Sequence, residues 1–275
     1  MPQKSPTPSV SKYSDPQGST EKGFFGFFEV VFRKFKGIVH AAMLAPIYAL
    51  GCACIGLALI PGIQFFHWSN DWAHSFPSTI RYGVLGFSIS TGYFLYGFSL
   101  VAIVPALNFV LRAKLKPWRG TYYSVGTVKW YIHNSLTYLM RYTFLEFITP
   151  TPFNLLFYKL MGMKIGKGTQ INSSHISDPS LIELGDRVTI GGSATICAHY
   201  GQAGFLVIAP VKIGDGAVIG LRAIIMGGVE IGAGAKVLAN SVVLPKTVIP
   251  AGETWAGVPA AKISLHAVKK DSKVA

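Results

Sequence analysis

The feature that most constrains the fold of this chain is a six-residue period in its C-terminal part. Aliphatic residues recur at this interval in one unbroken series: Ile213, Ile219, Ile225, Ile231, Val237, Val243 and Ile249. A small or β-branched residue stands two positions before each of them, as at Ala217 and Ala223. The same period occurs earlier, at Ile165 and Ile171 and again from Leu184 to Ile196. A repeat of fixed length indicates stacked structural units.

A period of six fits neither an α-helix nor a simple strand. It fits a chain that turns a corner every six residues and directs one aliphatic side chain inward on each face. Three faces make an 18-residue coil, and each coil buries its aliphatic residues only against its neighbours. Small residues are needed at the corners because the backbone turns tightly there. We therefore expect a mainly β domain, a prism of stacked parallel coils, over residues 163–263.

The N-terminal half has a different character. The chain is 50% hydrophobic and 13% charged, and its mean hydropathy of +0.41 is high for a soluble globular protein. No Asp, Glu, Lys or Arg occurs between Lys36 and Asp71, or between Arg81 and Arg112. A helix that spans a bilayer needs about 20 apolar residues. We predict two transmembrane helices, at about 38–66 and 82–111.

The flanking charges predict how this hairpin is oriented. Basic residues precede the first span and follow the second: Arg33, Lys34, Lys36, Arg112, Lys114, Lys116 and Arg119. The segment 67–81 between the spans has a single basic residue. By the positive-inside rule both ends of the hairpin face the cytoplasm. We expect a multi-pass protein of the inner (cytoplasmic) membrane with its repeat domain in the cytoplasm.

The remaining segments complete the expected organisation. The membrane region as a whole covers 23–162, and a short third membrane segment within 120–162 stays open as an alternative to surface helices. The other expected parts are a disordered tail over 1–22, an interfacial helix over 24–36, amphipathic helices over 120–162 and a flexible basic tail over 264–275. The net charge of +13 does not indicate nucleic acid, because the basic residues cluster beside apolar spans. Three cysteines, two of them inside the first span, predict reduced thiols.

His199 stands where the six-residue period breaks. The next aliphatic residue that we assign to the series after Ile196 is Val207, eleven positions later. We expect an extra loop of about five residues directly after His199. Imidazole has an ordinary pKa near 6.5, so His199 could accept a proton near neutral pH as a general base. A structural histidine that binds backbone is the alternative.

A base histidine is usually oriented by an acceptor on its other ring nitrogen. An 18-residue coil would place Leu181 beside His199, so the expected orienting carboxylates are Asp178 and Glu183, with a backbone carbonyl as the alternative. His175 is the only other histidine in the repeat domain. Two histidines argue against a zinc site, which takes at least three protein ligands.

The repeat VKIGDGAVIGLRAIIMGGVEIGAGAKVLANSVV and the closing WAGVPAAKI resemble the left-handed β-helix, hexapeptide-repeat acyltransferases. The combination of LIELGDRVTIGG, CAH and IPAGETWAGVPA is similar to hexapeptide domains of surface-polysaccharide O-acetyltransferases and of membrane-attached amino-acid polymer or peptide synthetases. The resemblance implies a left-handed parallel β-helix, a homotrimer, and a loop that reaches the neighbouring subunit. It assigns His199 as the general base in the cleft between subunits.

The resemblance also implies a donor and its contacts. The family binds acyl-CoA along the groove between subunits, and acetyl-CoA is the simplest donor. The matching positions are Leu221 and Ala239, which are equivalent residues of successive coils. Trp255 and Lys262 flank the G-x-P-A turn, where they could meet adenine and phosphates; a lid over the prism end is the alternative for Trp255. Arg222 replaces a small residue and is expected near phosphate or acceptor.

Together these features predict a membrane-anchored acyltransferase without a metal, and the resemblance favours an O-acetyltransferase. It would move an acyl group from CoA to a hydroxyl or amine of a lipid-linked sugar, a glycolipid or a surface polymer precursor. A carrier-protein or aminoacyl thioester is the alternative donor. The competing hypotheses are a trimeric scaffold for a membrane-bound synthase or transporter and, less favoured, a metal hydratase.

Overall fold

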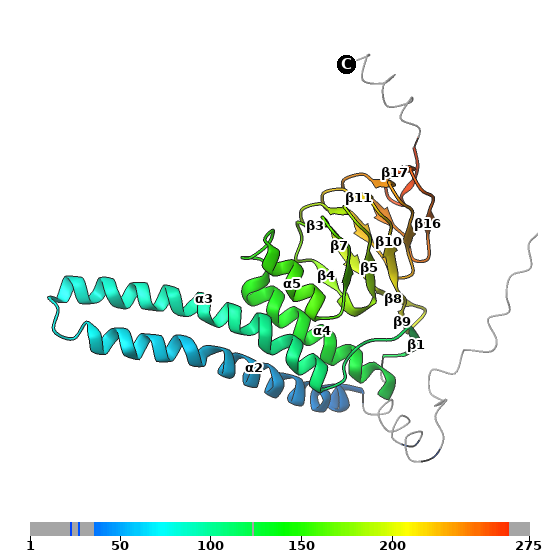
Figure 1. The fold of residues 1–275 in the computed structure, drawn as a ribbon. Coiled ribbons are helices and arrows are strands. Elements are labelled where there is room, and N and C mark those ends of the chain that lie inside the picture. The colour runs from blue at the N-terminus through cyan, green and yellow to red at the C-terminus, as the bar shows by residue number, and fades with distance from the viewer. Residues whose placement is uncertain (1–22, 24–26, 28–35, 123, 264–275) are drawn as a thin grey trace, which may run out of the picture.

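The computed structural model describes residues 23, 27, 36–122 and 124–263. The tails predicted over 1–22 and 264–275, and nearly all of the interfacial helix predicted over 24–36, lie outside the described residues. The described chain has two parts, a long helical hairpin with shorter helices at its base and a β prism that stands on those shorter helices (Figure 1).

The hairpin consists of α2 (Lys36–Trp72) and α3 (Ser78–Val110), which pack side by side and extend away from the prism (Figure 1). The two backbones come close where Gly62 faces Gly92, because a Cβ on Gly62 would lie 3.0 Å from the Gly92 carbonyl oxygen. The helices cover the apolar runs predicted as spans and continue from both sides into the segment 67–81.

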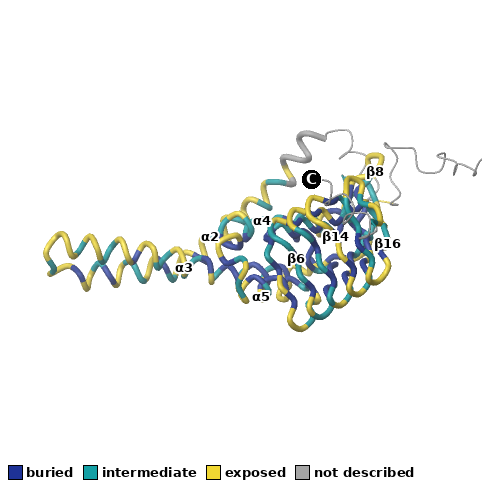
Figure 2. The backbone as a smooth tube through the Cα atoms, turned by 90° about the horizontal axis from the view of Figure 1, so that it is seen from above, coloured by how far each residue is buried: buried dark blue, intermediate teal, exposed yellow. Residues whose placement is uncertain are grey.

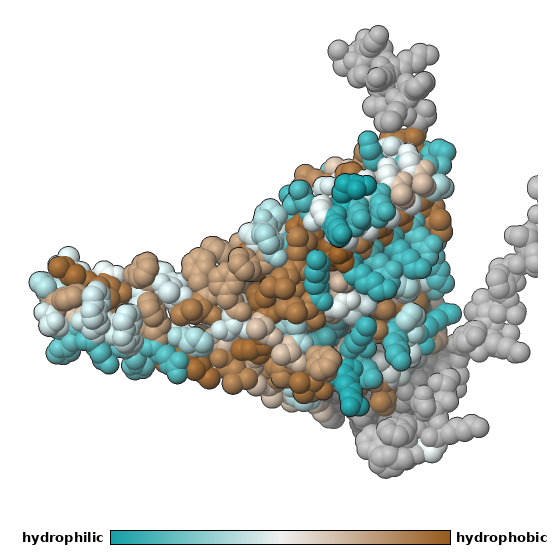
Figure 3. Space-filling view, viewed as in Figure 1, coloured by the Kyte–Doolittle hydropathy of each residue, from teal (hydrophilic) through white to brown (hydrophobic). Residues whose placement is uncertain are grey.

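The hairpin leaves much of its apolar surface outside. Only 11% of the apolar stretch of α2 and 39% of that of α3 are buried within the chain, whereas a core helix of a soluble protein is mostly buried. Its outer surface is largely exposed (Figure 2), and hydrophobic residues gather on the half of the hairpin nearer the prism (Figure 3). The helices have 37 and 33 residues. At a rise of about 1.5 Å per residue, both are long and apolar enough to cross a membrane.

Short elements connect the hairpin to the prism. In chain order they are β1 (Trp118–Thr121), the 3-10 turn η2 (Val125–Thr127), α4 (Val128–Met140), the π-helical turn η3 (Arg141–Leu145) and α5 (Pro152–Leu160). The helical elements fall within the segment predicted as amphipathic helices, 120–162. Their buried side chains, such as Phe144, Phe157 and Tyr158, join the core of the prism in one continuous cluster. The prism is thus anchored to the helical region by packing.

The prism has three parallel sheets. The first contains β2 (Lys164–Ile165), β5 (Ile182–Leu184), β10 (Val211–Ile213), β13 (Glu230–Ile231) and β16 (Val248–Ile249). The second contains β3 (Gln170–Ile171), β6 (Thr189–Ile190), β11 (Val218–Ile219), β14 (Lys236–Val237), β17 (Thr254–Ala256) and the antiparallel β18 (Ala261–Lys262). The third contains β4 (Ile176–Ser177), β7 (Thr195–Cys197), β12 (Ile224–Ile225) and β15 (Val242–Val243). The predicted parallel β-helix is confirmed.

The register explains the six-residue period. Ile213 pairs with Ile231, and Ile219 pairs with Val237, so each residue meets the one that lies three six-residue steps further along. These aliphatic side chains are at most 3% exposed and form the axial core. The corners are equally tight, because a Cβ on Gly220 would overlap the backbone of the next coil at Ala239.

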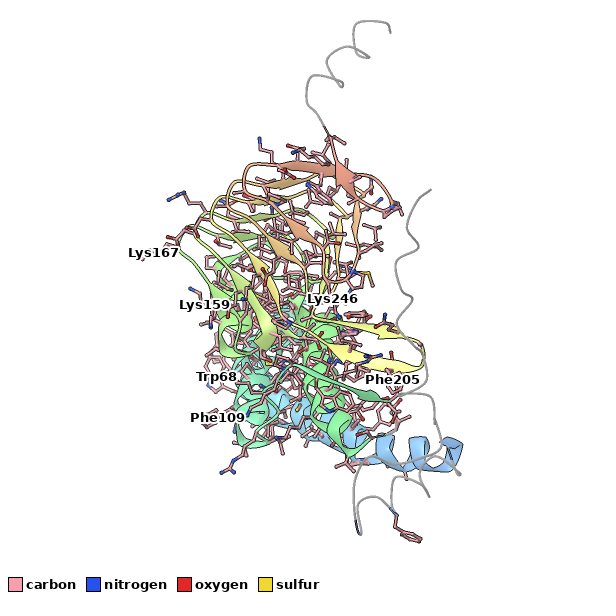
Figure 4. All side chains as sticks on the ribbon, turned by 90° about the vertical axis from the view of Figure 1, so that its right-hand side faces the viewer. Trp68, Phe109, Lys159, Lys167, Phe205 and Lys246 are labelled. Carbon is pink, nitrogen blue, oxygen red and sulfur yellow. The ribbon has the colours of Figure 1, made fainter. Side chains whose placement is uncertain are left out.

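The break after Ile196 is larger than the sequence count predicted. Ile196 pairs with Ile225, so the excursion adds eleven positions to the regular 18-residue coil rather than about five. It is a hairpin of β8 (His199–Gln202) and β9 (Phe205–Ile208) that projects from the prism, with Phe205 near its far end (Figure 4). The count was wrong because Val207 belongs to this hairpin and not to the axial series.

The hairpin excursion is held by its own chain. Strand β1 pairs antiparallel with β9, with Trp118 opposite Ile208 and Thr121 opposite Phe205. The Arg119 guanidinium also lies over the Phe205 ring, 5.2 Å from its centroid. The segment that connects α3 to α4 therefore contributes the third strand of a small sheet beside His199.

Candidate active site

His199 is the first residue of β8, where the chain leaves the prism after β7. Its Nδ1 lies 2.5 Å from Oδ2 of Asp178. The Asp178 side chain is fully buried and that of His199 is 21% exposed. Because a carboxylate can only accept, Nδ1 carries the proton in this hydrogen bond, and in the neutral imidazole Nε2 is then the nitrogen with the free lone pair. Nε2 has no hydrogen-bond partner among the residues that the structure describes.

The path of the preceding coil delivers Asp178 to the imidazole. Ile176 pairs with Ile196 and Ser177 with Cys197, so this coil is two positions longer than a regular one. The short turn η4 (Pro179–Leu181) supplies the additional length, so the prediction that Leu181 lies beside His199 was wrong. Asp178 adopts a left-handed backbone with φ of 60°, a conformation that Asp tolerates better than most residues.

Two side chains of α4 complete the surroundings of the pair. Nδ2 of Asn134 donates a 2.7 Å hydrogen bond to Oδ1 of Asp178, the oxygen that His199 does not use. The Trp130 ring packs edge-on against the His199 ring, with centroids 5.1 Å apart and planes at 77°. Sequence reasoning missed both residues. Their only signal is a spacing of four on one helix, which puts them on the same face without indicating what that face meets.

Glu183, the other predicted carboxylate, lies elsewhere. It belongs to β5 in the first sheet, and its Oε1 is 2.6 Å from Nζ of Lys164. Both side chains are exposed, at 43% and 76%. The structure brings Asp178 to His199 and leaves Glu183 in an ion pair on another face of the prism.

The neighbouring titratable groups do not suit nucleophilic chemistry. Burial, with the Asp178 charge as a second cause, raises the pKa of the Cys197 thiol to about 11, although Arg141 and a hydrogen bond to Ser177 oppose the rise. Cys197 therefore stays a thiol near neutral pH.

His175 stands apart from the pair. Burial and the charge of Arg141 lower its pKa, against an opposing effect of Glu146. The carboxylate of Glu146 accepts a hydrogen bond from the neighbouring Ser174 hydroxyl. In the described part of the chain, no three His, Cys, Asp or Glu side chains gather as a metal ion would require.

The predicted donor contacts follow the prism wall. The pairing of Ile219 with Val237 puts Leu221 beside Ala239 in successive coils, as predicted, and Leu221 is 52% exposed. Arg222 has a φ of 54°, and Asn240 occupies the equivalent corner one coil later with a φ of 56°. An arginine is unusual in this left-handed conformation.

Trp255 and Lys262 face each other across the closing strands β17 and β18. Glu253, which sequence reasoning did not single out, joins them, because Lys262 Nζ lies 2.5 Å from one carboxylate oxygen and Trp255 Nε1 donates at 2.9 Å to the other. The hydrogen bond from Lys262 is the main cause that lowers the pKa of Glu253. The partly buried Trp255 also packs against the end of the core.

Comparisons with known proteins agree with this architecture. Residues 210–245 match the family model described as "Hexapeptide repeat of succinyl-transferase". The chain is 32% identical over 124 residues to the putative acetyltransferase YvoF of Bacillus subtilis, covering 42% of this chain and 72% of that protein. It is 33% identical over 108 residues to delta-poly-L-ornithine synthetase of Acinetobacter baumannii, covering 39% of this chain and 8% of that enzyme.

A solved structure is also similar. It is the hexapeptide-repeat-containing acetyltransferase of Vibrio cholerae in complex with acetyl-CoA, at 32% identity and a TM-score of 0.34, covering 38% of this chain and 60% of that one. The chain thus spans less than two thirds of this protein and a small part of the synthetase. The match to YvoF extends over most of that relative, and the family model falls on the repeat coils described above. The chain belongs to the hexapeptide-repeat acetyltransferase family.

Proposed function

We propose that this protein is a membrane-anchored acyltransferase with His199 as its general base. It moves an acyl group, most simply acetyl, from a CoA thioester to a hydroxyl or amine of a membrane-associated acceptor. The observation that carries the proposal is the hydrogen bond between His199 Nδ1 and the buried Asp178 carboxylate, which leaves Nε2 at a partly exposed position. A base needs this arrangement, since one nitrogen fixes the ring and the other meets the substrate.

The chemistry follows from the protonation states. The acceptor hydroxyl or amine gives its proton to Nε2 as its oxygen or nitrogen attacks the thioester carbonyl carbon. The tetrahedral intermediate collapses by breaking the carbon–sulfur bond, and the CoA thiolate takes the proton back from the imidazolium. Asp178 stabilises that imidazolium without becoming protonated, which is the role of the acid in related dyads.

The donor and the assembly are proposed from the family. Acetyltransferases of this fold require an acyl thioester, and Leu221 and Ala239 offer backbone groups on one corner of the prism wall for its pantetheine arm. Arg222 stands at the same corner, where Ser193 and Asn240 of the neighbouring coils share its left-handed backbone. We propose that Arg222 faces a phosphate of the donor or the acceptor, and that a second subunit of a homotrimer closes the cleft.

The acceptor is proposed from the placement of the site. His199 contacts α4, and α4 packs on α3, whose apolar outer surface is suited to lipid. An acceptor with a lipid anchor would therefore be held at the height of the site. A lipid-linked sugar, a glycolipid and a nascent surface polymer share this property. The basic residues at the base of the hairpin favour a cytoplasmic site in an inner membrane.

Substitution of His199 and of Asp178 tests the proposal. His199→Ala should reduce acyl transfer on the order of 10³-fold, within the range for loss of a general base. Asp178→Asn should reduce it by up to about 10⁴-fold, because an amide donor would favour the wrong imidazole tautomer. The assay is CoA thiol release in membranes that contain the full chain. A non-catalytic scaffold predicts that His199→Ala keeps the biological function, and that result would overturn the proposal.

A further inference from the structure

We infer that helix α4 is part of the active site, with Asn134 as a positioning residue for Asp178 and Trp130 as a positioning residue for His199. The inference rests on the proposed role of His199 as a base. It means that the prism supplies the reacting pair but the helical region supplies the groups that hold that pair in place.

The contact between Asn134 and Asp178 is buried and directional. Asn134 is 5% exposed and Asp178 is fully buried. The amide must present its nitrogen, since an ionised carboxylate only accepts. Each carboxylate oxygen therefore has one donor, Nδ1–H of His199 on Oδ2 and Nδ2–H of Asn134 on Oδ1. The two bonds fix the plane of the carboxylate and, through it, the direction of Nε2.

Trp130 holds the other member of the pair. Its ring meets the His199 ring edge to face, a geometry that aromatic pairs prefer. Trp130 and Asn134 are one helical turn apart, and Nδ2 of Asn134 also reaches the Trp130 carbonyl oxygen at 3.2 Å. A single face of α4 therefore contacts both His199 and Asp178.

His133, the residue before Asn134 on α4, faces α3 and not the prism. Nδ1 of His133 lies 2.8 Å from Oδ1 of Asn108 in α3, and both side chains are buried. Adjacent residues of one helix thus bind α3 and the prism through buried polar bonds. This explains how a repeat domain can keep its catalytic pair in a fixed geometry relative to the apolar hairpin.

The charged surroundings decide the sign of the expected pH effect. Among the described residues, Cys197 on β7 and His133 on α4 interact electrostatically with Asp178, and Arg141 at the start of η3 interacts with Cys197. Cys197 has a pKa of about 11 and His133 a pKa of about 4, and arginine is always charged, so none of these three changes its charge near neutral pH. The Asn134 hydrogen bond stabilises the pair in its negative, unprotonated form. Its loss favours proton uptake by the pair and moves the acidic limb of the rate profile to higher pH.

The test compares Asn134→Leu with Asn154→Leu in the full chain. Asn154 is a matched control, because it is 1% exposed, lies on α5 and donates a 2.8 Å hydrogen bond to the Ile171 carbonyl of the prism. For Asn134→Leu we expect a roughly tenfold lower kcat, an unchanged KM for acetyl-CoA and an acidic limb about half a pH unit higher, in line with one lost hydrogen bond to a charged group. For Asn154→Leu we expect the wild-type pH profile.

Variants of Trp130 and an NMR titration complete the test. Trp130→Phe keeps the ring contact and should keep most of the activity, whereas Trp130→Leu should lose several-fold in kcat. The NMR signal of the His199 imidazole is identified by its absence in His199→Ala. In Asn134→Leu this signal should titrate at higher pH than in the wild type, whether or not acyl transfer is detected. A shifted titration with no transfer by the wild type would reject the proposed function and leave the α4 contact standing. An identical titration and pH profile for Asn134→Leu and Asn154→Leu would overturn the inference.

Discussion

The prism buries its apolar residues, whereas the helical hairpin leaves many of its apolar residues exposed. The prism turns Ile219, Ile225 and Val237 inward until they are at most 1% exposed, and each coil is stabilised by the coil beside it. The hairpin leaves Leu57, Ile63 and Phe87 between 51% and 70% exposed, and its two helices bury side chains along the seam between them and against the short helices at their base. One region buries its apolar residues within itself, and the other exposes helices that are long and apolar enough to cross a membrane.

The contrast shows that hydrophobic content alone does not indicate where a segment lies. Both regions are rich in aliphatic residues. In the prism, the period of six directs these side chains to one axis. In the hairpin, a charge-free run long enough for a helix places apolar side chains on every face of that helix. The candidate site lies where the two regions meet, at the contact between α4 and the prism.

The largest effect should come from a core truncation. Ile219→Ala removes a fully buried side chain from the prism axis and should lower the free energy of unfolding by about 2–5 kcal/mol. Leu57→Ala on α2, which is 51% exposed, should change it by less than about 0.5 kcal/mol. Denaturant unfolding of the purified chain in detergent measures both. Equal losses would show that the hairpin surface is packed against protein.

A charge on the hairpin should act on membrane insertion instead. Phe87 is 70% exposed on α3, and Phe87→Arg should make insertion less favourable by about 3–4 kcal/mol on the translocon scale. The matched control is Val248→Arg, at a prism position that is 61% exposed, which should leave the carbonate-resistant membrane fraction unchanged. Full membrane retention of Phe87→Arg would contradict the assignment of this surface to lipid.

The junction between the two regions should be sensitive to acid. Burial lowers the pKa of His133 to about 4, against the opposing charge of Asp178. The unfolded chain takes up this proton near pH 6.5 and the folded chain only near pH 4, so stability falls as the pH drops through this window. The loss amounts to up to about 3 kcal/mol.

His133→Gln removes this titration and keeps a donor for Asn108. The fall in stability between pH 6.5 and pH 4 should therefore be smaller in His133→Gln than in the wild type, measured by thermal unfolding at each pH. The same slope in both proteins would mean that His133 is not a buried neutral group at this junction.

The smallest effect is expected on the outer face of the prism. Glu183→Gln breaks an exposed ion pair with Lys164, and such pairs contribute less than about 1 kcal/mol. Activity should stay at the wild-type level, in contrast to Asp178→Asn. A large loss of activity in Glu183→Gln would transfer the orienting role away from Asp178.

The repeat domain could be predicted well because its period is a direct consequence of the coil geometry. The length of the excursion could not be predicted, because the aliphatic Val207 does not belong to the axial series. It lies in β9, which pairs with β1. Both Asp178 and Glu183 were named from the sequence, but choosing between them depends on the two residues that η4 adds to one coil. Trp130 and Asn134 could not be foreseen, because their contact with the pair depends on how α4 docks on the prism.

Isotope transfer is the most direct measurement of the central claim that His199 and Asp178 move an acyl group to a membrane acceptor. Membranes that contain the full chain are supplied with carbon-13-labelled acetyl-CoA, and the lipid and glycan fraction is analysed by mass spectrometry. We expect one labelled acetyl increment on a membrane-extractable species with the wild type and a near-complete loss of that label with His199→Ala. Equal label with both proteins, or label in neither, would contradict it.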